Sequence, residues 1–339
     1  MTKGKKLTTA GEIVLKVLSD FPKHPTKSLA EKIYNENPLV FKDAESARSA
    51  IRYHRGESGE RFRKYSKNFK ENGKSEKIIV TTKIPKSWSK EKKVFKIPSG
   101  YKKIGFVSDF QAPFHDEKAI EIAVNHLLDK KIDCLFINGD FLDFYGLSNF
   151  EKDPRKRDFK GEREDCIELL RWLRSKFKCP IYYNLDANHE YRYERYMMTK
   201  APAIYATDMF HIEDLFMLHD IGIIPIRGYD HILIGKLPVV HGHTIFRGQT
   251  SPVSPARTIY MKLKTTAIAS HVHKVSQYTC VNLYGEVMSF WTTGCFMNLN
   301  VDYNQHGNDY THGFAIIDIL DSKGSFRVNN HMIINNVVH

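Results

Sequence analysis

The sequence has few cysteines and no long apolar segment. Its cysteines form no CxxC pair, which is typical of buried thiols in a reducing compartment rather than of a disulfide framework. No run of eighteen apolar residues occurs, so we expect no membrane span. The basic start of the chain is not followed by an apolar segment, which argues against a secretory signal. The five cysteines are Cys134, Cys166, Cys179, Cys280 and Cys295.

Positive charge is concentrated near the N-terminus. The chain of 339 residues has a formal net charge of +12, with ordinary proportions of hydrophobic (42%) and charged (27%) residues for a globular protein. Residues 1–98 hold 24 of its 51 Lys and Arg residues but only 11 of its 39 Asp and Glu residues, so the remainder is nearly neutral. Such a segment favours phosphate-rich polymers or acidic surfaces as partners.

Residues 1–66 are predicted to form a small helical domain. Apolar spacing indicates helices over residues 9–18, 26–37 and 43–53. A three-helix unit with a basic last helix resembles a helix-turn-helix module that binds nucleic acid. However, the segment between the second and third helices is longer than the usual turn, so a solvated basic helix remains an open alternative. The basic face consists of Arg48, Arg52 and Arg55.

Residues 67–100 are rich in lysine and are predicted to be a linker. Short segments at 77–82 and 94–97 have strand character and are separated by proline and serine. We expect that this linker adds an edge strand to the domain that follows it.

Residues 101–339 are predicted to form an α/β domain. Buried strands near 104–108, 134–138 and 181–185 alternate with two amphipathic helices, which indicates right-handed crossovers and a parallel sheet. The second half of this region reads mainly as strands. We therefore expect two facing sheets with helices on their outer faces.

Polar residues stand where the first three of these strands end. Asp109, Asp140 and Asn188 follow the strands in turn, and ligands of parallel sheets collect beyond the carboxyl ends of strands. Two histidine motifs, His241-Gly242-His243 and His271-Val272-His273, come later. Oxygen and imidazole ligands on rigid elements suit hard divalent cations. The sequence therefore predicts a metal site.

The order of these motifs resembles that of the calcineurin-like metallophosphoesterase superfamily. The family pattern is D-x-H, GD-x-x-D, GNH-E/D, a lone H and GH-x-H, and the likeness covers residues 102–320. It implies a four-layer α/β/β/α sandwich, here with a small N-terminal helical domain. The matching segments are Asp109-Phe110-Gln111, Gly139-Asp140-Phe141-Leu142-Asp143, Ala187-Asn188-His189-Glu190, His241 and Ser270-His271-Val272-His273.

The resemblance implies two metal ions that share Asp140. Cations about 4 Å apart repel each other, and a shared carboxylate with a bridging hydroxide offsets that repulsion. The hydroxide would attack phosphorus in line, and His189 would assist the leaving oxygen. Asp143 would orient His189 and stabilise its charge. One ion would be held by Asp109, Gln111, Asp140 and His273, and the other by Asp140, Asn188, His241 and His271.

Two positions in these motifs leave alternatives open. Gln111 stands where the family has a histidine, and its neutral amide oxygen predicts Mn²⁺ as the preferred metal, with Mg²⁺, Fe²⁺ or Zn²⁺ as other options. His115 is an alternative ligand to Gln111. Either His241 or His243 could bind the second ion, and we expect His243 to lie behind the ligands or to contact substrate.

Arginines and tyrosines follow His189 directly, over residues 191–196. Arg192 and Arg195 are candidates for contacts with an extended phosphodiester substrate; the alternative is an ordinary helix with both arginines on an exposed face. Residues 188–192, together with 293–296 and 311–314, resemble a subgroup common in phages and prophages. We therefore expect a cytoplasmic protein of a bacterial host or a phage-infected cell.

We expect a metal-dependent phosphodiesterase or nuclease that acts on nucleic acid and is targeted by its basic N-terminal region. Two alternatives remain. The same metal chemistry would serve a phosphomonoesterase or protein phosphatase, and Gln111 could mark a DNA-binding protein with a degenerate phosphoesterase domain. The sequence does not indicate the oligomeric state.

Overall fold

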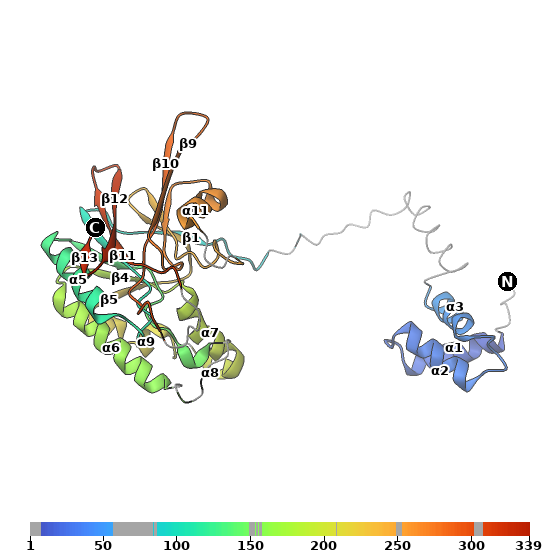
Figure 1. Ribbon diagram of the computed structural model, residues 1–339. Coiled ribbons are helices and arrows are strands. Elements are labelled where there is room, and N and C mark those ends of the chain that lie inside the picture. The colour runs from blue at the N-terminus through green and yellow to red at the C-terminus, as the bar shows by residue number, and fades with distance from the viewer. Residues whose placement is uncertain are drawn as a thin grey trace. The chain divides into compact units, whose positions relative to one another are not determined.

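The computed structural model describes residues 8–56, 84, 87–148, 153, 155, 158–207, 209–248, 253–301 and 308–339. The chain divides into two units, Met1–Trp88 and Ser89–His339 (Figure 1). None of the described helices combines the length and the apolar character that a membrane crossing needs. The predicted segment 77–82 lies outside the described residues, and the domain boundaries predicted at residues 66 and 100 stay predictions.

The N-terminal unit contains the three predicted helices, α1 (Thr9–Asp20), α2 (Thr26–Glu36) and α3 (Ala44–His54). The Thr8 side chain caps α1, and Asp43 and Ser46 form a capping box at the start of α3. The helices pack around a core of their own, formed by Val14, Leu29, Ala30, Ile33, Phe41, Ala47 and Ile51.

In the second unit, a seven-stranded sheet has the order β13-β12-β11-β2-β3-β4-β5. Its strands β2, β3 and β4 are parallel, as predicted; β5 adds a fourth parallel strand, and β11, β12 and β13 add an antiparallel edge. The bounds are β2 (Lys103–Val107), β3 (Cys134–Ile137), β4 (Ile181–Asn184), β5 (Ile223–Ile226), β11 (His312–Ile319), β12 (Phe326–Ile334) and β13 (Val337–Val338).

A six-stranded sheet has the order β1-β6-β7-β8-β10-β9. Strand β1 pairs parallel with β6 at the edge, which confirms the edge strand predicted from residues 94–97. The bounds are β1 (Lys93–Lys96), β6 (Tyr229–Ile234), β7 (Leu237–Val239), β8 (Ala267–Ala269), β9 (Ser276–Val281) and β10 (Val287–Thr292).

The two sheets pack face to face with helices outside them. Phe106 and Phe136 stack at 5.6 Å between ring centroids and pack against Ile232 and Trp291 of the other sheet. On the opposite face of the seven-stranded sheet lie α5 (Glu117–Asp129) and α6 (Phe159–Lys176), and α11 (Pro255–Leu263) packs on the outer face of the six-stranded sheet. The layer order is therefore α/β/β/α, which confirms the predicted fold class.

Short elements complete the unit between β3 and β5. They are the 3-10 turn η2 (Tyr145–Leu147), α7 (Asn188–Lys200), α8 (Pro202–Tyr205), α9 (Ile212–Leu215) and α10 (Leu218–Ile221). Helix α7 begins four residues after β4 ends, so its first turn lies at the carboxyl edge of the parallel strands.

Candidate metal centre

All seven predicted metal ligands follow the carboxyl ends of strands, and both sheets contribute. Strands β2, β3 and β4 are parallel neighbours in one sheet, and β7 and β8 are parallel neighbours in the other. The ligands are Asp109 and Gln111 after β2, Asp140 after β3, Asn188 after β4, His241 after β7, and His271 and His273 after β8.

Five of these ligands have a backbone conformation that residues other than glycine rarely adopt. Their φ angles are positive: 55° at Asp109, 49° at Gln111, 50° at Asp140, 74° at His271 and 55° at His273. Such left-handed conformations cost roughly 1–3 kcal/mol each and persist where surrounding structure enforces them. Their concentration at these strand ends supports treating them as the candidate functional site.

The ligand atoms form two clusters that share Asp140. One cluster contains Asp140, His241 and His271, the other contains Asp109, Asp140 and His273, and within each cluster the atoms lie within 4.8 Å of one another. His241 Nε2 is 3.2 Å from Asp140 Oδ2, and His273 Nε2 is 3.3 Å from Asp109 Oδ1. Asp140 thus occupies the bridging place that the resemblance implied.

Among the described residues, several of these buried atoms make no hydrogen bond of good geometry, although ring nitrogens lie close to the two carboxylate oxygens. They include Asp109 Oδ1, Asp140 Oδ2 and His271 Nδ1. Buried carboxylate oxygens normally have partners, because an unpaired charged group is costly to remove from water. Oxygens and ring nitrogens that converge in this way fit divalent cations.

Neighbouring groups fix the orientation of the remaining ligands. His241 Nδ1 donates to the Asn138 carbonyl oxygen at 2.7 Å, which directs Nε2 into the cluster. That Nε2 is 3.1 Å from the Asn188 side-chain oxygen. The Gln111 amide lies 3.0 Å from His273 Nε2, and rotating the amide by half a turn would direct its oxygen there. Gln111 therefore lies where the family's histidine is expected.

The electrostatics of the cluster favour ionised carboxylates. Burial alone would raise the pKa of Asp140, but the histidine rings around it hold that pKa well below its usual range. Burial would likewise lower the pKa of His241, but the Asp140 carboxylate raises it to about 10. A bound cation would take over the role that ring protons have here as the counter-charge of Asp140.

His189 and Asp143 are connected through Arg192. His189 Nδ1 donates to the Leu142 carbonyl oxygen at 3.2 Å, and Nε2 accepts from Arg192 Nη2 at 2.9 Å. Arg192 Nη1 pairs with Asp143 Oδ1 at 2.9 Å. The structure places the Leu142 carbonyl at Nδ1 and the Arg192 guanidinium between the Asp143 carboxylate and Nε2. The role of Asp143 in orienting His189 stays a prediction.

This arrangement requires a neutral His189. A guanidinium only donates and a carbonyl only accepts, so the ring carries its single proton on Nδ1. Burial lowers the pKa of His189, the Asp140 carboxylate 3.7 Å from Nε2 raises it, and the Arg192 charge lowers it, so that the pKa is about 4.

The other predicted contact residues occupy different surroundings. His243 lies beside the cluster, with its ring centroid 5.7 Å from that of His241. Arg195 donates to the Leu147 carbonyl oxygen at 3.1 Å. His115, the alternative ligand, is not in either described ligand cluster and lines a separate cavity. The substrate-binding roles of Arg192, Arg195 and His243 stay predictions.

In the N-terminal unit the three predicted arginines differ. Arg55 donates to Thr26 Oγ1 and to the His24 carbonyl oxygen, both at 2.7 Å, so it ties α3 to the start of α2. Arg48 pairs with Glu45 at 3.1 Å, and Arg52 is exposed. Arg48 and Arg52 therefore remain the predicted nucleic-acid contacts with exposed positions.

Sequence reasoning missed Glu190, which holds the loop that carries Asp140. Its carboxylate accepts from the backbone amides of Asp140 and Phe141, both at 3.0 Å, and from the Tyr183 hydroxyl at 2.5 Å. The only signal in the sequence was its place directly after His189 in the motif.

No protein-family model matches the chain. The Gene 54 protein of Mycobacterium phage L5 is 25% identical over 232 residues, which is 64% of this chain and 89% of that protein. Wild-type Vps29 complexed with Zn²⁺ from Entamoeba histolytica has a TM-score of 0.36 and 11% identity, over 70% of this chain and 96% of that one. YfcE, a phosphoesterase from E. coli, has a TM-score of 0.31 and 14% identity, over 67% of this chain and 98% of that one.

Proposed function

We propose that this chain is a metal-dependent phosphoesterase. The observation that carries the proposal is the pair of ligand clusters that share Asp140. Within each cluster the ligand atoms lie within 4.8 Å of one another, and most of these ligands have a backbone of positive φ. Two divalent ions bound there would supply an activated water and neutralise the phosphoryl oxygens. Buried carboxylate oxygens without partners fit that occupancy, because they are already turned toward the point where an ion would lie.

The donor set supports Mn²⁺, with Mg²⁺, Fe²⁺ or Zn²⁺ as other options. Carboxylate and amide oxygens are hard donors, and the imidazoles add borderline nitrogens that Mg²⁺ uses less. The first ion would be held by Asp109, Gln111, Asp140 and His273, and the second by Asp140, Asn188, His241 and His271.

His189 and Arg192 would act on the leaving group. Neutral His189 accepts a hydrogen bond from Arg192 at Nε2. The imidazole and the guanidinium therefore lie together beside Asp140. Arg192 would donate its hydrogen bond to the departing oxygen. Once that bond has shifted, His189 Nε2, which carries no proton in this arrangement, would take a proton from water and pass it to the departing oxygen. The Asp143 carboxylate would hold Arg192 in place.

We further propose a nucleic-acid diester as the substrate. The concentration of Lys and Arg in residues 1–98 and the exposed Arg48 and Arg52 on α3 support this class. Arg192 and Arg195 lie one helical turn apart on α7, the helix that begins with Asn188. A relative from a mycobacteriophage supports a phage or prophage source, with the cytoplasm of the bacterial host as the place of action.

Hydrolysis of model esters tests the proposal. The metal-stripped full-length chain, resupplied with Mn²⁺, should hydrolyse bis-p-nitrophenyl phosphate faster than p-nitrophenyl phosphate. His189→Asn should lower kcat by about 10²–10⁴-fold while the metal content stays the same. His219→Asn, at an exposed position on α10, is the matched control.

The other outcomes identify the alternatives. A preference for the monoester would indicate a phosphomonoesterase or protein phosphatase. No hydrolysis of either ester, together with no bound metal, would indicate a DNA-binding protein with a degenerate phosphoesterase domain.

A further inference from the structure

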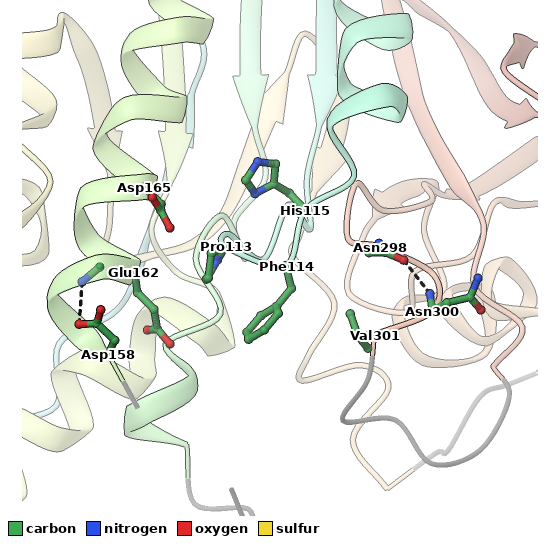
Figure 2. A pocket seen from close by; sticks show the side chains of 10 residues that line it. Pro113, Phe114, His115, Asp158, Glu162, Asp165, Asn298, Asn300 and Val301 are labelled. Carbon is green, nitrogen blue, oxygen red and sulfur yellow. Dashed lines mark hydrogen bonds between the residues drawn. The ribbon is translucent and has the colours of Figure 1, made fainter. Parts of the chain in front are cut away.

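A cavity of about 610 Å³ lies outside both ligand clusters (Figure 2). Three segments line it: the loop before α5, the first two turns of α6, and the loop that follows Phe296. Its volume is in the range of sites that hold small organic ligands. The side chains that matter below are Phe114, His115, Asp158, Glu162, Asp165 and Asn298.

Glu162 is the unusual group in this cavity. Its side chain points toward the space enclosed by the three segments (Figure 2), although the residue is only 4% exposed. Among the described residues, neither carboxylate oxygen accepts a hydrogen bond of good geometry, although the Gly146 and Tyr145 backbone amides lie close enough to lower its pKa. A buried carboxylate without partners is costly, and a ligand that brings donors would relieve that cost.

The charge of the lining favours a cation. Asp158 and Asp165 add two carboxylates from the same helix, and the described residues of the lining include no lysine or arginine. Burial lowers the pKa of His115, so its ring is neutral near neutral pH and adds no positive charge. An anion or a phosphate would be repelled here.

A single metal ion does not fit this cavity. Among the described residues, ligand atoms gather within 4.8 Å only in the two clusters at Asp140. The Asp158 carboxylate is already used, because it accepts from the Gly161 amide at 2.9 Å and caps α6. The volume is also many times that of an ion, so the ligand is an organic group.

We propose that this cavity binds an organic cation through a guanidinium group, with two parallel N–H donors on the Glu162 carboxylate. The guanidinium group is planar, weakly hydrated and matched to two-point binding of a carboxylate. Phe114 lies across the cavity from Glu162 (Figure 2), where its ring can pack against the flat face of the group. Phe114 is half-buried, and its ring would turn aside to admit the ligand.

Calorimetric titration of the full-length protein tests this inference with two probes. Agmatine represents a free guanidinium compound, and a capped Gly-Arg-Gly peptide represents an arginine side chain of a partner. We expect saturable 1:1 binding of at least one probe. The probe that binds more tightly shows whether the guanidinium group belongs to a free compound or to an arginine side chain of a partner. Glu162→Gln should weaken binding at least tenfold, whereas Glu164→Gln, an exposed position on the same helix, should leave it unchanged.

Asp165→Asn is a second variant in case Glu162→Gln does not fold. Removing this exposed rim charge should weaken binding about two- to threefold, as expected for a solvated charge. Absence of binding by both probes would overturn the proposal, and so would equal binding by wild type and Glu162→Gln. Binding of neutral guanosine in place of both cations would overturn it as well. None of these outcomes depends on phosphoesterase activity.

Discussion

Asp140 lies where the two ligand clusters meet, and Glu190 holds its backbone in place. The Glu190 carboxylate accepts from two backbone amides and the Tyr183 hydroxyl. Groups that orient metal ligands in this way typically contribute 10–100-fold to metal affinity. The geometry of the candidate centre therefore depends on a residue that contributes no ligand atom to either cluster.

Glu190→Gln should weaken Mn²⁺ binding by about 10–100-fold. The new amide nitrogen cannot accept from a backbone amide, so one of the two bonds to the Asp140 loop is lost. Tyr183→Phe removes a single hydroxyl contact and should have a smaller effect. Equilibrium dialysis of both variants measures this difference, and an unchanged affinity in Glu190→Gln would show that Asp140 is held by other contacts.

The pH dependence of stability should report on Glu162. Burial, and then the nearby Asp143 charge, raise the pKa of Glu162 from 4.5 to about 7 in the folded chain. Between these two pH values the folded state binds more protons than the unfolded state. The contribution of Glu162 to the free energy of unfolding therefore falls as the pH rises toward 7. Glu162→Gln should therefore raise the free energy of unfolding at pH 8 by about 2 kcal/mol more than at pH 5.

Urea unfolding of wild type and Glu162→Gln at both pH values, without a cavity ligand, measures this difference. Glu164→Gln, an exposed glutamate on α6, should show no such change with pH. If Glu162→Gln raised the free energy of unfolding equally at pH 5 and pH 8, Glu162 would titrate normally.

At the scale of elements, the turn after β3 limits what can replace Gly139. Its φ is +87°, and an added Cβ would lie 2.3 Å from the Ala187 Cβ and 3.1 Å from His241 Nδ1. Both neighbours belong to the metal site: Ala187 precedes Asn188, and His241 is a predicted ligand. Only glycine allows β3, α7 and the segment after β7 to approach so closely.

Gly139→Ala should lower the free energy of unfolding and reduce Mn²⁺ binding. We expect a loss of roughly 2–4 kcal/mol, from backbone strain together with overpacking. Gly228→Ala is the matched control, because φ is +78° there and nothing lies within 4 Å of the added Cβ. Thermal and urea unfolding compare the two variants, and equal losses would show that strain alone determines the effect.

The order of elements was predictable because its signals are local. Buried strands that end in Asp109 and Asp140 place both carboxylates at one sheet edge, and the alternation with helices fixes a parallel sheet. The contacts of His189 were not predictable. They depend on the direction of the Leu142 carbonyl and on the reach of Arg192, which only the folded backbone determines. The burial of Glu162 was hidden for the same reason, since acidic residues near a helix start are usually exposed.

At the scale of the whole molecule, the chain joins a basic three-helix unit to a nearly neutral α/β/β/α unit. If the basic unit binds nucleic acid, its affinity should depend strongly on salt, because binding releases counterions from the phosphates. Of the three predicted contacts, Arg48 and Arg52 are exposed, whereas Arg55 also bonds within the unit itself.

Replacing both Arg48 and Arg52 by alanine should weaken DNA binding at 50 mM salt and reduce the salt slope by roughly two. Fluorescence anisotropy of full-length protein with a labelled duplex measures both quantities. Lys16→Ala, an exposed change on α1, is the control and should alter the slope by less than one. An unchanged slope in the double variant would place nucleic-acid binding elsewhere.

The central claim is that two divalent ions are held together through Asp140, and metal stoichiometry tests it most directly. Elemental analysis of the full-length chain after dialysis against Mn²⁺ should give two ions per chain. Asp140→Asn should bind fewer than one, because both clusters lose a charged ligand at once, whereas Asp220→Asn, at an exposed position on α10, should still bind two. Two ions retained in Asp140→Asn, or none in the wild type, would contradict the account.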